Sequence, residues 1–145
     1  MGMDEKTIKD LIKAAKGKLK DSYAPYSKFH VAAALLAADG TIFTGINIEN
    51  ASYGLCNCAE RTAIFSAVEK GVRDFKAICI MGAPEEELPD IISGGAAKEY
   101  CPPCGACRQV MSEFCKKDFV VVLAKSEEDY ETYTLGELLP VSFTL

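Results

Sequence analysis

Two groups of cysteines that lie far apart in the sequence constrain how this chain can fold. Cys58 is followed by Ala59 and Glu60, and the run Pro103-Cys104-Gly105-Ala106-Cys107 comes much later. Three thiols and one carboxylate suit a zinc ion with three protein ligands, an open fourth position for water and an acid/base group beside it. For the thiols to share one ion, the fold must bring both groups together. Such a combination is typical of a hydrolytic metal site.

Both cysteine groups fall where the sequence predicts the start of a helix. Free backbone N–H groups and the positive end of the helix dipole stabilise anions there, by about 0.3–1 kcal/mol each, and thiolates are therefore favoured. Cys104 and Cys107 are three residues apart and share one helix face, while Cys58 comes from the other helix. Three thiolates leave a zinc site with net negative charge, which Arg61 can offset by hydrogen-bonding to the sulfurs.

Glu60 has two interpretations. With Asn57 as the N-cap, Glu60 is the third helical residue, where the carboxylate of a capping box bonds back to the N–H of the cap residue. Against this, Glu60 lies in register with Ile64 and Ala67 on the apolar stripe of the helix, which would bury it beside the metal. Burying a carboxylate costs free energy, so a buried carboxylate is expected to have a partner or a function.

Two other cysteines lie close to the predicted ligands. Cys56 competes with Cys58, or joins the three thiols in a closed four-cysteine structural site. Cys101 extends the later run to Cys-x2-Cys-x2-Cys, but the fourth cysteine followed by proline of bacterial ferredoxins is missing, which disfavours an iron–sulfur cluster.

Three more residues with metal-binding side chains have simpler interpretations. Cys79 and Cys115 lie among apolar residues and are predicted to be buried small hydrophobes. His30, the only histidine, lies on a predicted strand with no acidic or thiol neighbour in the sequence. We therefore expect His30 to be structural.

Helices alternate with strands along much of the chain. Predicted helices cover about residues 4–21, capped by Asp4, then 58–70, a segment starting near 103, and 135–139; predicted strands cover 29–37, 41–46, 75–81, 119–123 and 130–134. A hairpin turn is expected at Asp39-Gly40, and loops are expected at 47–57 and 83–102. The pattern predicts one α/β domain over residues 1–145, with three α/β/α layers and a mixed sheet of about five strands.

Size and charge narrow the possible functions. A length of 145 residues suffices for one buried core, and a formal net charge of −5 argues against dependence on a nucleic-acid backbone. The lysines between residues 6 and 20 alternate with apolar residues, as on the solvated face of an amphipathic helix. With no membrane-spanning run or signal-peptide core, we expect no membrane partner and a cytoplasmic location, where cysteines are more often metal ligands or buried thiols than disulfides.

Three segments of the chain resemble the small homotetrameric cytidine deaminases of the cytidine/deoxycytidylate deaminase superfamily. They are Asn47-Ile48-Glu49-Asn50-Ala51, Cys58-Ala59-Glu60-Arg61-Thr62-Ala63 and Pro103-Cys104-Gly105-Ala106-Cys107-Arg108-Gln109, and the similarity extends from about Tyr23 to Pro140. Zinc deaminases carry an H-x-E and P-C-x-x-C signature, and Cys58 stands at the histidine position. The resemblance implies one Zn²⁺ per chain held by Cys58, Cys104 and Cys107, with Glu60 as the proton shuttle.

Substrate contacts are also implied by the resemblance. The implied contacts are Asn47 and Glu49 to the ribose hydroxyls, Phe29 on the base, Ala51, Tyr53 and Ala59 along the pocket, and Phe143 in a neighbouring subunit's site. The implied reaction is the hydrolysis of cytidine and 2′-deoxycytidine to uridine and 2′-deoxyuridine plus ammonia, by a homotetramer. Two alternatives remain open. One is a deaminase of a related or modified nucleoside, of the blasticidin type. The other is a non-catalytic module held together by a structural zinc site with four cysteine ligands.

Overall fold

A five-stranded mixed sheet forms the centre of the computed structural model, which describes residues 3–145. The strand order is β2-β1-β3-β4-β5. The strands are β1 (Phe29–Ala37), β2 (Ile42–Ile46), β3 (Phe75–Pro84), β4 (Val120–Ala124) and β5 (Tyr130–Thr134). β1 pairs antiparallel with β2 and β3, β3 pairs parallel with β4, and β4 pairs antiparallel with β5. The predicted mixed sheet is confirmed.

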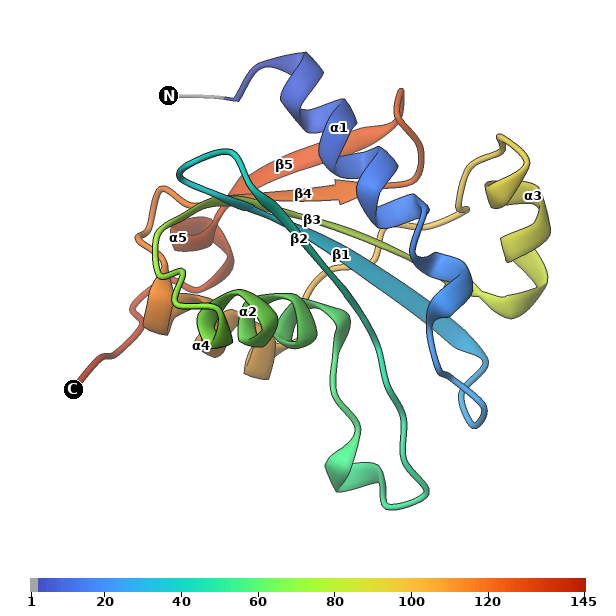
Figure 1. Ribbon diagram of the computed structural model, residues 1–145, viewed down its shortest axis with the longest axis horizontal. Helices are drawn as coiled ribbons and strands as arrows, with labels where there is room; N and C mark the ends of the chain where they lie inside the picture. The colour runs from blue at the N-terminus through green and yellow to red at the C-terminus, as the bar shows by residue number, and fades with distance from the viewer. Residues whose placement is uncertain (1–2) are drawn as a thin grey trace.

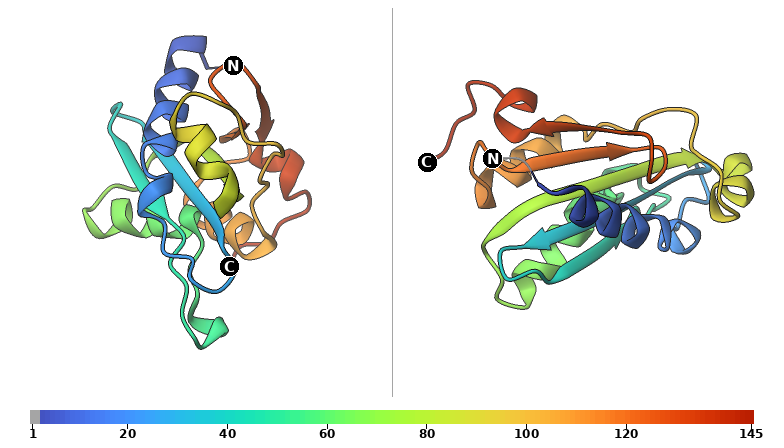
Figure 2. Two further views of the ribbon diagram at one scale, coloured as in Figure 1. Left: turned by 90° about the vertical axis from the view of Figure 1, so that its right-hand side faces the viewer. Right: turned by 90° about the horizontal axis from the view of Figure 1, so that it is seen from above.

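Helices cover both faces of this sheet (Figures 1 and 2). One core contains residues of α1 (Glu5–Lys16) and α3 (Leu88–Ile92), and the other contains residues of α2 (Ala59–Glu69) and α4 (Gly105–Phe114). The short α5 (Leu135–Leu138) follows β5 and contacts α4. The layers are therefore α/β/α, as expected. Among residues 3–145, no helix has the length and apolar character needed to cross a membrane.

β1 is buried on both faces because it lies inside the sheet with helices above and below. Ala32 and Ala34 belong to the core on the α1 side, whereas Ala33 and Leu35 belong to the core on the α2 side. A strand of this kind shows a continuous apolar run instead of an alternating one. Its predicted bounds, residues 29–37, are confirmed.

Gly45 on β2 allows α2 to pack unusually close to the sheet. A Cβ atom at this position would lie 2.3 Å from the carbonyl oxygen of Ala59 and 2.4 Å from the nitrogen of Ala63. No side chain fits between these backbones, so only glycine permits the contact. Because Ala59 follows Cys58 directly, this contact also sets where the first cysteine group lies.

The first helix is shorter than predicted. Asp4 caps it as expected, accepting a hydrogen bond of 2.7 Å from the Thr7 N–H. The helix ends at Lys16, and the segment Leu19–Asp21 forms a 3₁₀ turn that buries Leu19. Gly17 explains the early end, since glycine loses more backbone entropy in a helix than any other residue.

The interpretation of residues 83–102 as one long loop is partly wrong. β3 continues to Pro84 because its end pairs with Phe29 at the start of β1. A 3₁₀ turn and α3 then follow, and Leu88 and Ile91 join the core beneath α1. Two apolar residues three apart, set among prolines and glycines, are too few to show helical periodicity in the sequence.

Candidate metal centre and substrate site

The fold brings three thiols together from two helices. The Sγ atoms of Cys58, Cys104 and Cys107 all lie within 4.8 Å of one another, with 3.9 Å between Cys58 and Cys104 and 3.5 Å between Cys104 and Cys107. Tetrahedral zinc with Zn–S bonds of about 2.3 Å places its sulfurs roughly 3.8 Å apart. The three thiols therefore fit one zinc ion, and no second cluster of this kind is found in residues 3–145.

Both helix starts are set by cysteines. Cys58 is the N-cap of α2 and Cys104 is the N-cap of α4, each with an extended backbone, and Cys107 lies in the first turn of α4. The alternative with Asn57 as cap is wrong, because the Cys58 carbonyl already accepts the first helical bond, from the Thr62 N–H at 3.0 Å. Glu60 is thus the second helical residue and forms no capping box.

Arg61 contacts the cluster as its position suggested. Its Nη2 donates a 3.1 Å hydrogen bond to Cys58 Sγ. Its Nε is buried and finds no acceptor among the described residues, which leaves a further donor beside the sulfurs. Hydrogen bonds from the Cys107 thiol and from Arg61 lower the pKa of Cys58 to about 5, while the pKa of Cys107 is raised by the same shared proton. The thiolate of Cys58 is thus stabilised, in the deprotonated form that a zinc ligand takes.

Glu60 is buried next to these sulfurs, with 4% of its surface exposed. Burial raises the pKa of its carboxyl to about 7, and the negative charge of the nearby Cys58 thiolate contributes to the same shift. A carboxyl with this pKa can both accept and release a proton near neutral pH. Its burial without a capping role supports the second interpretation of Glu60.

A loop over residues 47–57 projects from the sheet and is fastened to the segment before β1 (Figure 1). The Glu49 carboxylate accepts hydrogen bonds from the N–H groups of Tyr26, at 3.0 Å, and Ser27, at 3.1 Å, and from the Ser27 hydroxyl. These hydrogen bonds lower the pKa of Glu49, and the bond from the Ser27 hydroxyl has the largest effect. The carboxylate is thus ionised and held in place.

Asn47 at the start of this loop is tied to β1. Its amide nitrogen donates to the Phe29 carbonyl at 2.8 Å, and its Oδ1 accepts from the Val31 N–H at 3.0 Å. The two backbone partners fix which end of the amide is oxygen, since one can only accept and the other can only donate. Both residues implied to hold the ribose, Asn47 and Glu49, are therefore held by hydrogen bonds with β1 or with the segment just before it.

Phe29 lies on the same side of the molecule as the metal centre. A Cβ atom on Gly82 would meet Cys101 Sγ at 2.8 Å and the Phe29 ring at 3.2 Å, so these two side chains flank one glycine. The pKa of Cys101 is raised to about 12, first by burial and then by the charges of Glu60 and Cys58. Cys101 thus lies near both the Phe29 ring and Glu60. It is not a member of the thiol cluster.

Of the remaining implied contacts, all but Ala59 lie on the surface of the single chain. Ala51 is exposed, Ala59 is buried, and Tyr53 is 67% exposed with its ring edge-on to Tyr26 at 6.1 Å. Phe143 is 68% exposed near the C-terminus, which projects away from the sheet in Figure 1.

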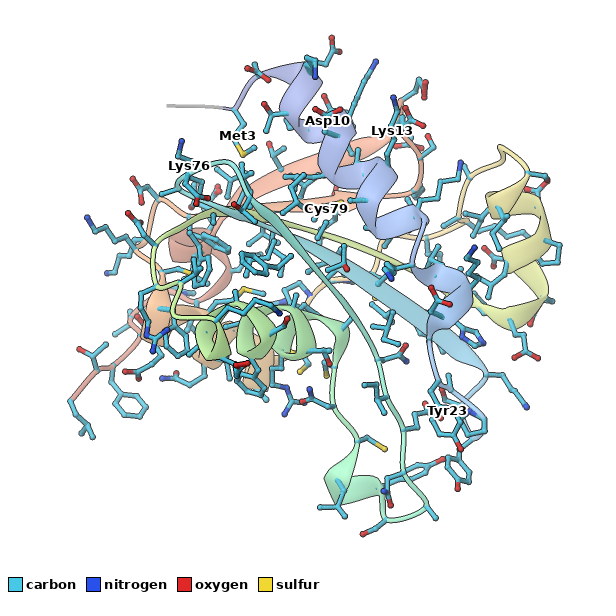
Figure 3. The ribbon with its side chains drawn as sticks, in the orientation of Figure 1. Met3, Asp10, Lys13, Tyr23, Lys76 and Cys79 are labelled. Atoms are coloured by element: carbon cyan, nitrogen blue, oxygen red, sulfur yellow. The ribbon has the colours of Figure 1, made fainter. Side chains whose placement is uncertain are left out.

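Two of the other cysteines are clearly separated from the cluster. Cys79 lies on the sheet face beneath α1 (Figure 3), and burial alone raises the pKa of its thiol. Cys56 Sγ accepts a 3.3 Å hydrogen bond from the Asn50 N–H and donates to the Asn50 carbonyl at 3.6 Å. The closed four-cysteine site is therefore wrong: Cys56 is bound to its own loop.

Replacing Cys56 by serine is expected to leave zinc at one ion per chain, because the hydroxyl can keep both contacts to Asn50 and no metal ligand is lost. Metal content measured by atomic absorption checks this, with Cys104→Ser as the matched variant that should lose the ion. Loss of zinc from Cys56→Ser would restore the four-cysteine alternative.

One cavity lies away from the metal centre. It has a volume of about 860 Å³ and is lined by residues that include Met3, Asp10 and Lys76 (Figure 3). None of the three clustered cysteines lines it.

Three polar residues around the site were not singled out from the sequence. Ser27 holds Glu49, Ser22 contacts Asn47, and Glu85 contacts His30. Their partners lie 22, 25 and 55 residues away, so no local pattern reveals them. His30 is buried between Ser22 and Glu85, in line with a structural role.

A three-thiol centre with a buried carboxyl beside it, set on a three-layer α/β fold, defines a zinc-dependent hydrolase. Residues 5–123 match the family model of the cytidine and deoxycytidylate deaminase zinc-binding region. The chain belongs to this family, whose cofactor is one zinc ion per chain.

Individual relatives agree with the family match. A cytidine deaminase from Halalkalibacterium halodurans is 47% identical over 137 residues, covering 94% of this chain and 91% of the relative. A crystal structure of cytidine deaminase from Burkholderia pseudomallei superimposes with a TM-score of 0.78 at 48% identity, covering 92% of this chain and 97% of that one. A blasticidin-S deaminase from Bacillus cereus is 30% identical, covering 93% of this chain and 91% of the relative.

Proposed function

We propose that this protein hydrolyses cytidine and 2′-deoxycytidine to uridine and 2′-deoxyuridine, with release of ammonia. The observation that carries the proposal is the buried Glu60, whose pKa is raised to about 7, beside three thiols that fit a zinc ion. A structural zinc site needs neither this carboxyl nor an open position. The high identity to cytidine deaminases over most of the chain supports the same substrates.

Cys58, Cys104 and Cys107 hold the zinc ion, which when bound supplies Lewis-acid activation of water. Glu60 accepts the proton of the attacking water and delivers it to the ring nitrogen of cytosine. After the water oxygen has bonded to the amino-bearing carbon, Glu60 takes the remaining proton from that oxygen and passes it to the amino group, so that the C–N bond breaks to give ammonia as the C=O bond forms. One carboxyl can serve both steps because its pKa lies near neutral pH.

Asn47 and Glu49 hold the sugar in the proposed complex. The Asn47 amide keeps one N–H beyond its bond to Phe29, and the Glu49 carboxylate keeps free lone pairs beyond its bonds to Tyr26 and Ser27. A donor and an acceptor are thus available for ribose hydroxyls. These contacts are remote from the reacting carbon, yet positioning by such groups can lower a barrier by several kcal/mol.

We also propose a homotetramer in the cytoplasm. Several large apolar side chains are more than 45% exposed in the single chain, among them Tyr53, Leu55, Phe65 and Phe143. Burying them between subunits, with Phe143 reaching a neighbouring site, accounts for this exposure. Seven free cysteines fit a reducing compartment. Sedimentation equilibrium tests the assembly, and a monomer at micromolar concentration would contradict it.

The proposed reaction is tested by measuring turnover and zinc content on the same preparation. Ultraviolet absorbance follows cytidine, 2′-deoxycytidine and blasticidin S as separate substrates. We expect turnover of both cytidine nucleosides by zinc-loaded protein. Turnover of blasticidin S alone would favour the modified-nucleoside alternative, and an inactive zinc-loaded protein would favour a non-catalytic module.

A further inference from the structure

Four polar side chains form a continuous chain of contacts behind Asn47. Glu85 Oε1 lies 3.0 Å from His30 Nε2, His30 Nδ1 lies 3.0 Å from Ser22 Oγ, and the Ser22 hydroxyl donates to Asn47 Oδ1. His30 and Ser22 are buried, with 8% and 9% of their surfaces exposed. We call these four residues, Glu85, His30, Ser22 and Asn47, the His30 relay.

The directions of the hydrogen bonds in the relay follow from the backbone. The Val31 N–H can only donate, which identifies the Asn47 atom facing it as Oδ1. Ser22 has a single hydroxyl hydrogen, and it is used on Asn47 Oδ1. The Ser22 oxygen must therefore accept from His30 Nδ1–H. Asn47 is thus supported by a side chain that is itself held by His30.

The same short segment supports both residues proposed to hold the sugar. Ser22 contacts Asn47, while Tyr26 and Ser27, a few residues later, hold the Glu49 carboxylate. The segment in turn is fixed to β1 and to the start of the 3₁₀ turn after β3 through His30 and Glu85.

We propose that Ser22, His30 and Glu85 are positioning residues for nucleoside binding, which keep the Asn47 amide oriented toward a sugar hydroxyl. This inference rests on the proposed function, since it requires that Asn47 contacts the ribose. A group held rigidly by buried partners loses less conformational entropy when it binds a ligand. Weakening the relay therefore lowers affinity for the sugar without changing the groups that carry out the chemistry.

The experiment compares two ligands that differ only in the sugar. KM and kcat are measured for cytidine, and the inhibition constant is measured for 2′,3′-dideoxycytidine, which lacks the 2′- and 3′-hydroxyls of the sugar. In Ser22→Ala and His30→Leu we expect KM for cytidine to rise about fivefold to tenfold, the effect of one lost hydrogen bond. We expect kcat and the inhibition constant of the dideoxynucleoside to stay within about twofold.

Two further variants separate positioning from general stability. His30→Asn can present an amide N–H where Nδ1 lies, and it should bring KM for cytidine back to within about twofold of the original protein. Glu86→Gln removes a neighbouring exposed charge, for which no hydrogen bond or ion pair is found in the part of the chain that the structure describes, and it should change nothing. Thermal unfolding and zinc content confirm that each variant is folded.

An unchanged KM for cytidine in folded Ser22→Ala would overturn the positioning role while leaving the proposed function intact. An equal loss of affinity for cytidine and for 2′,3′-dideoxycytidine would do the same. An original protein that turns over no cytidine when loaded with zinc would instead contradict the proposed function, and the positioning role with it.

Discussion

Glu60→Ala is expected to reduce kcat for cytidine by about 10²–10⁴-fold, the usual contribution of a general acid/base. Zinc should remain at one ion per chain, because all three thiols are kept. The free energy of unfolding should not fall, since the change removes a buried carboxyl whose ionisation is opposed by burial. Kinetics, metal content and thermal unfolding measured on one preparation check all three expectations.

Glu60→Gln and Glu69→Ala are the controls for this prediction. Gln keeps the shape of Glu60 but cannot carry a proton between water and base, so it should be as inactive as alanine. Glu69 lies exposed at the other end of α2, and its removal should leave kcat unchanged. A zinc-loaded Glu60→Ala protein with the original turnover would rule out the proposed mechanism.

Among substitutions that add a single methyl group, Gly45→Ala is expected to lower the free energy of unfolding the most. The new Cβ would lie 2.3 Å and 2.4 Å from backbone atoms of Ala59 and Ala63, and neither backbone can give way without moving α2. Overpacking of this kind costs about 3 kcal/mol at the upper end of the usual range, equivalent to a fall in Tm of about 10 °C. The shift of α2 should also displace Cys58 and lower zinc content.

Gly54→Ala is the matched control, since nothing lies within 4 Å of a Cβ at that position and its φ is not in the left-handed region. Differential scanning calorimetry and metal analysis on both variants make the comparison. A Gly45→Ala protein with the Tm and zinc content of the control would mean that β2 and α2 are not in backbone contact.

The sheet could be predicted from the sequence because its signals are local. The strand at residues 29–37 is followed by Asp39-Gly40, and Gly40 has the positive φ of 95° that a hairpin turn needs. The thiol cluster could be predicted for the same reason, since each cysteine group lies at a helix start. The resemblance through residues 47–51 then indicated the substrate class.

What could not be predicted depends on contacts between distant parts of the chain. Asn57 is a better capping residue than Cys58 by propensity, yet α2 starts after Cys58, where Gly45 brings the strand against the helix. His30 has no acidic neighbour in the sequence, but the pairing of β1 with β3 brings Glu85 to it. Tertiary structure, not local pattern, decides both cases.

Cys58 and Cys104 are 46 residues apart in the chain and 3.9 Å apart at their sulfurs. An ion shared between them therefore acts as a reversible cross-link between two halves of the fold. Because the unfolded chain offers no preformed site, the ion adds about 4 kcal/mol to the free energy of unfolding when its free concentration is roughly a thousand times Kd. The supply of zinc thus affects how much of the protein is folded as well as whether it can react.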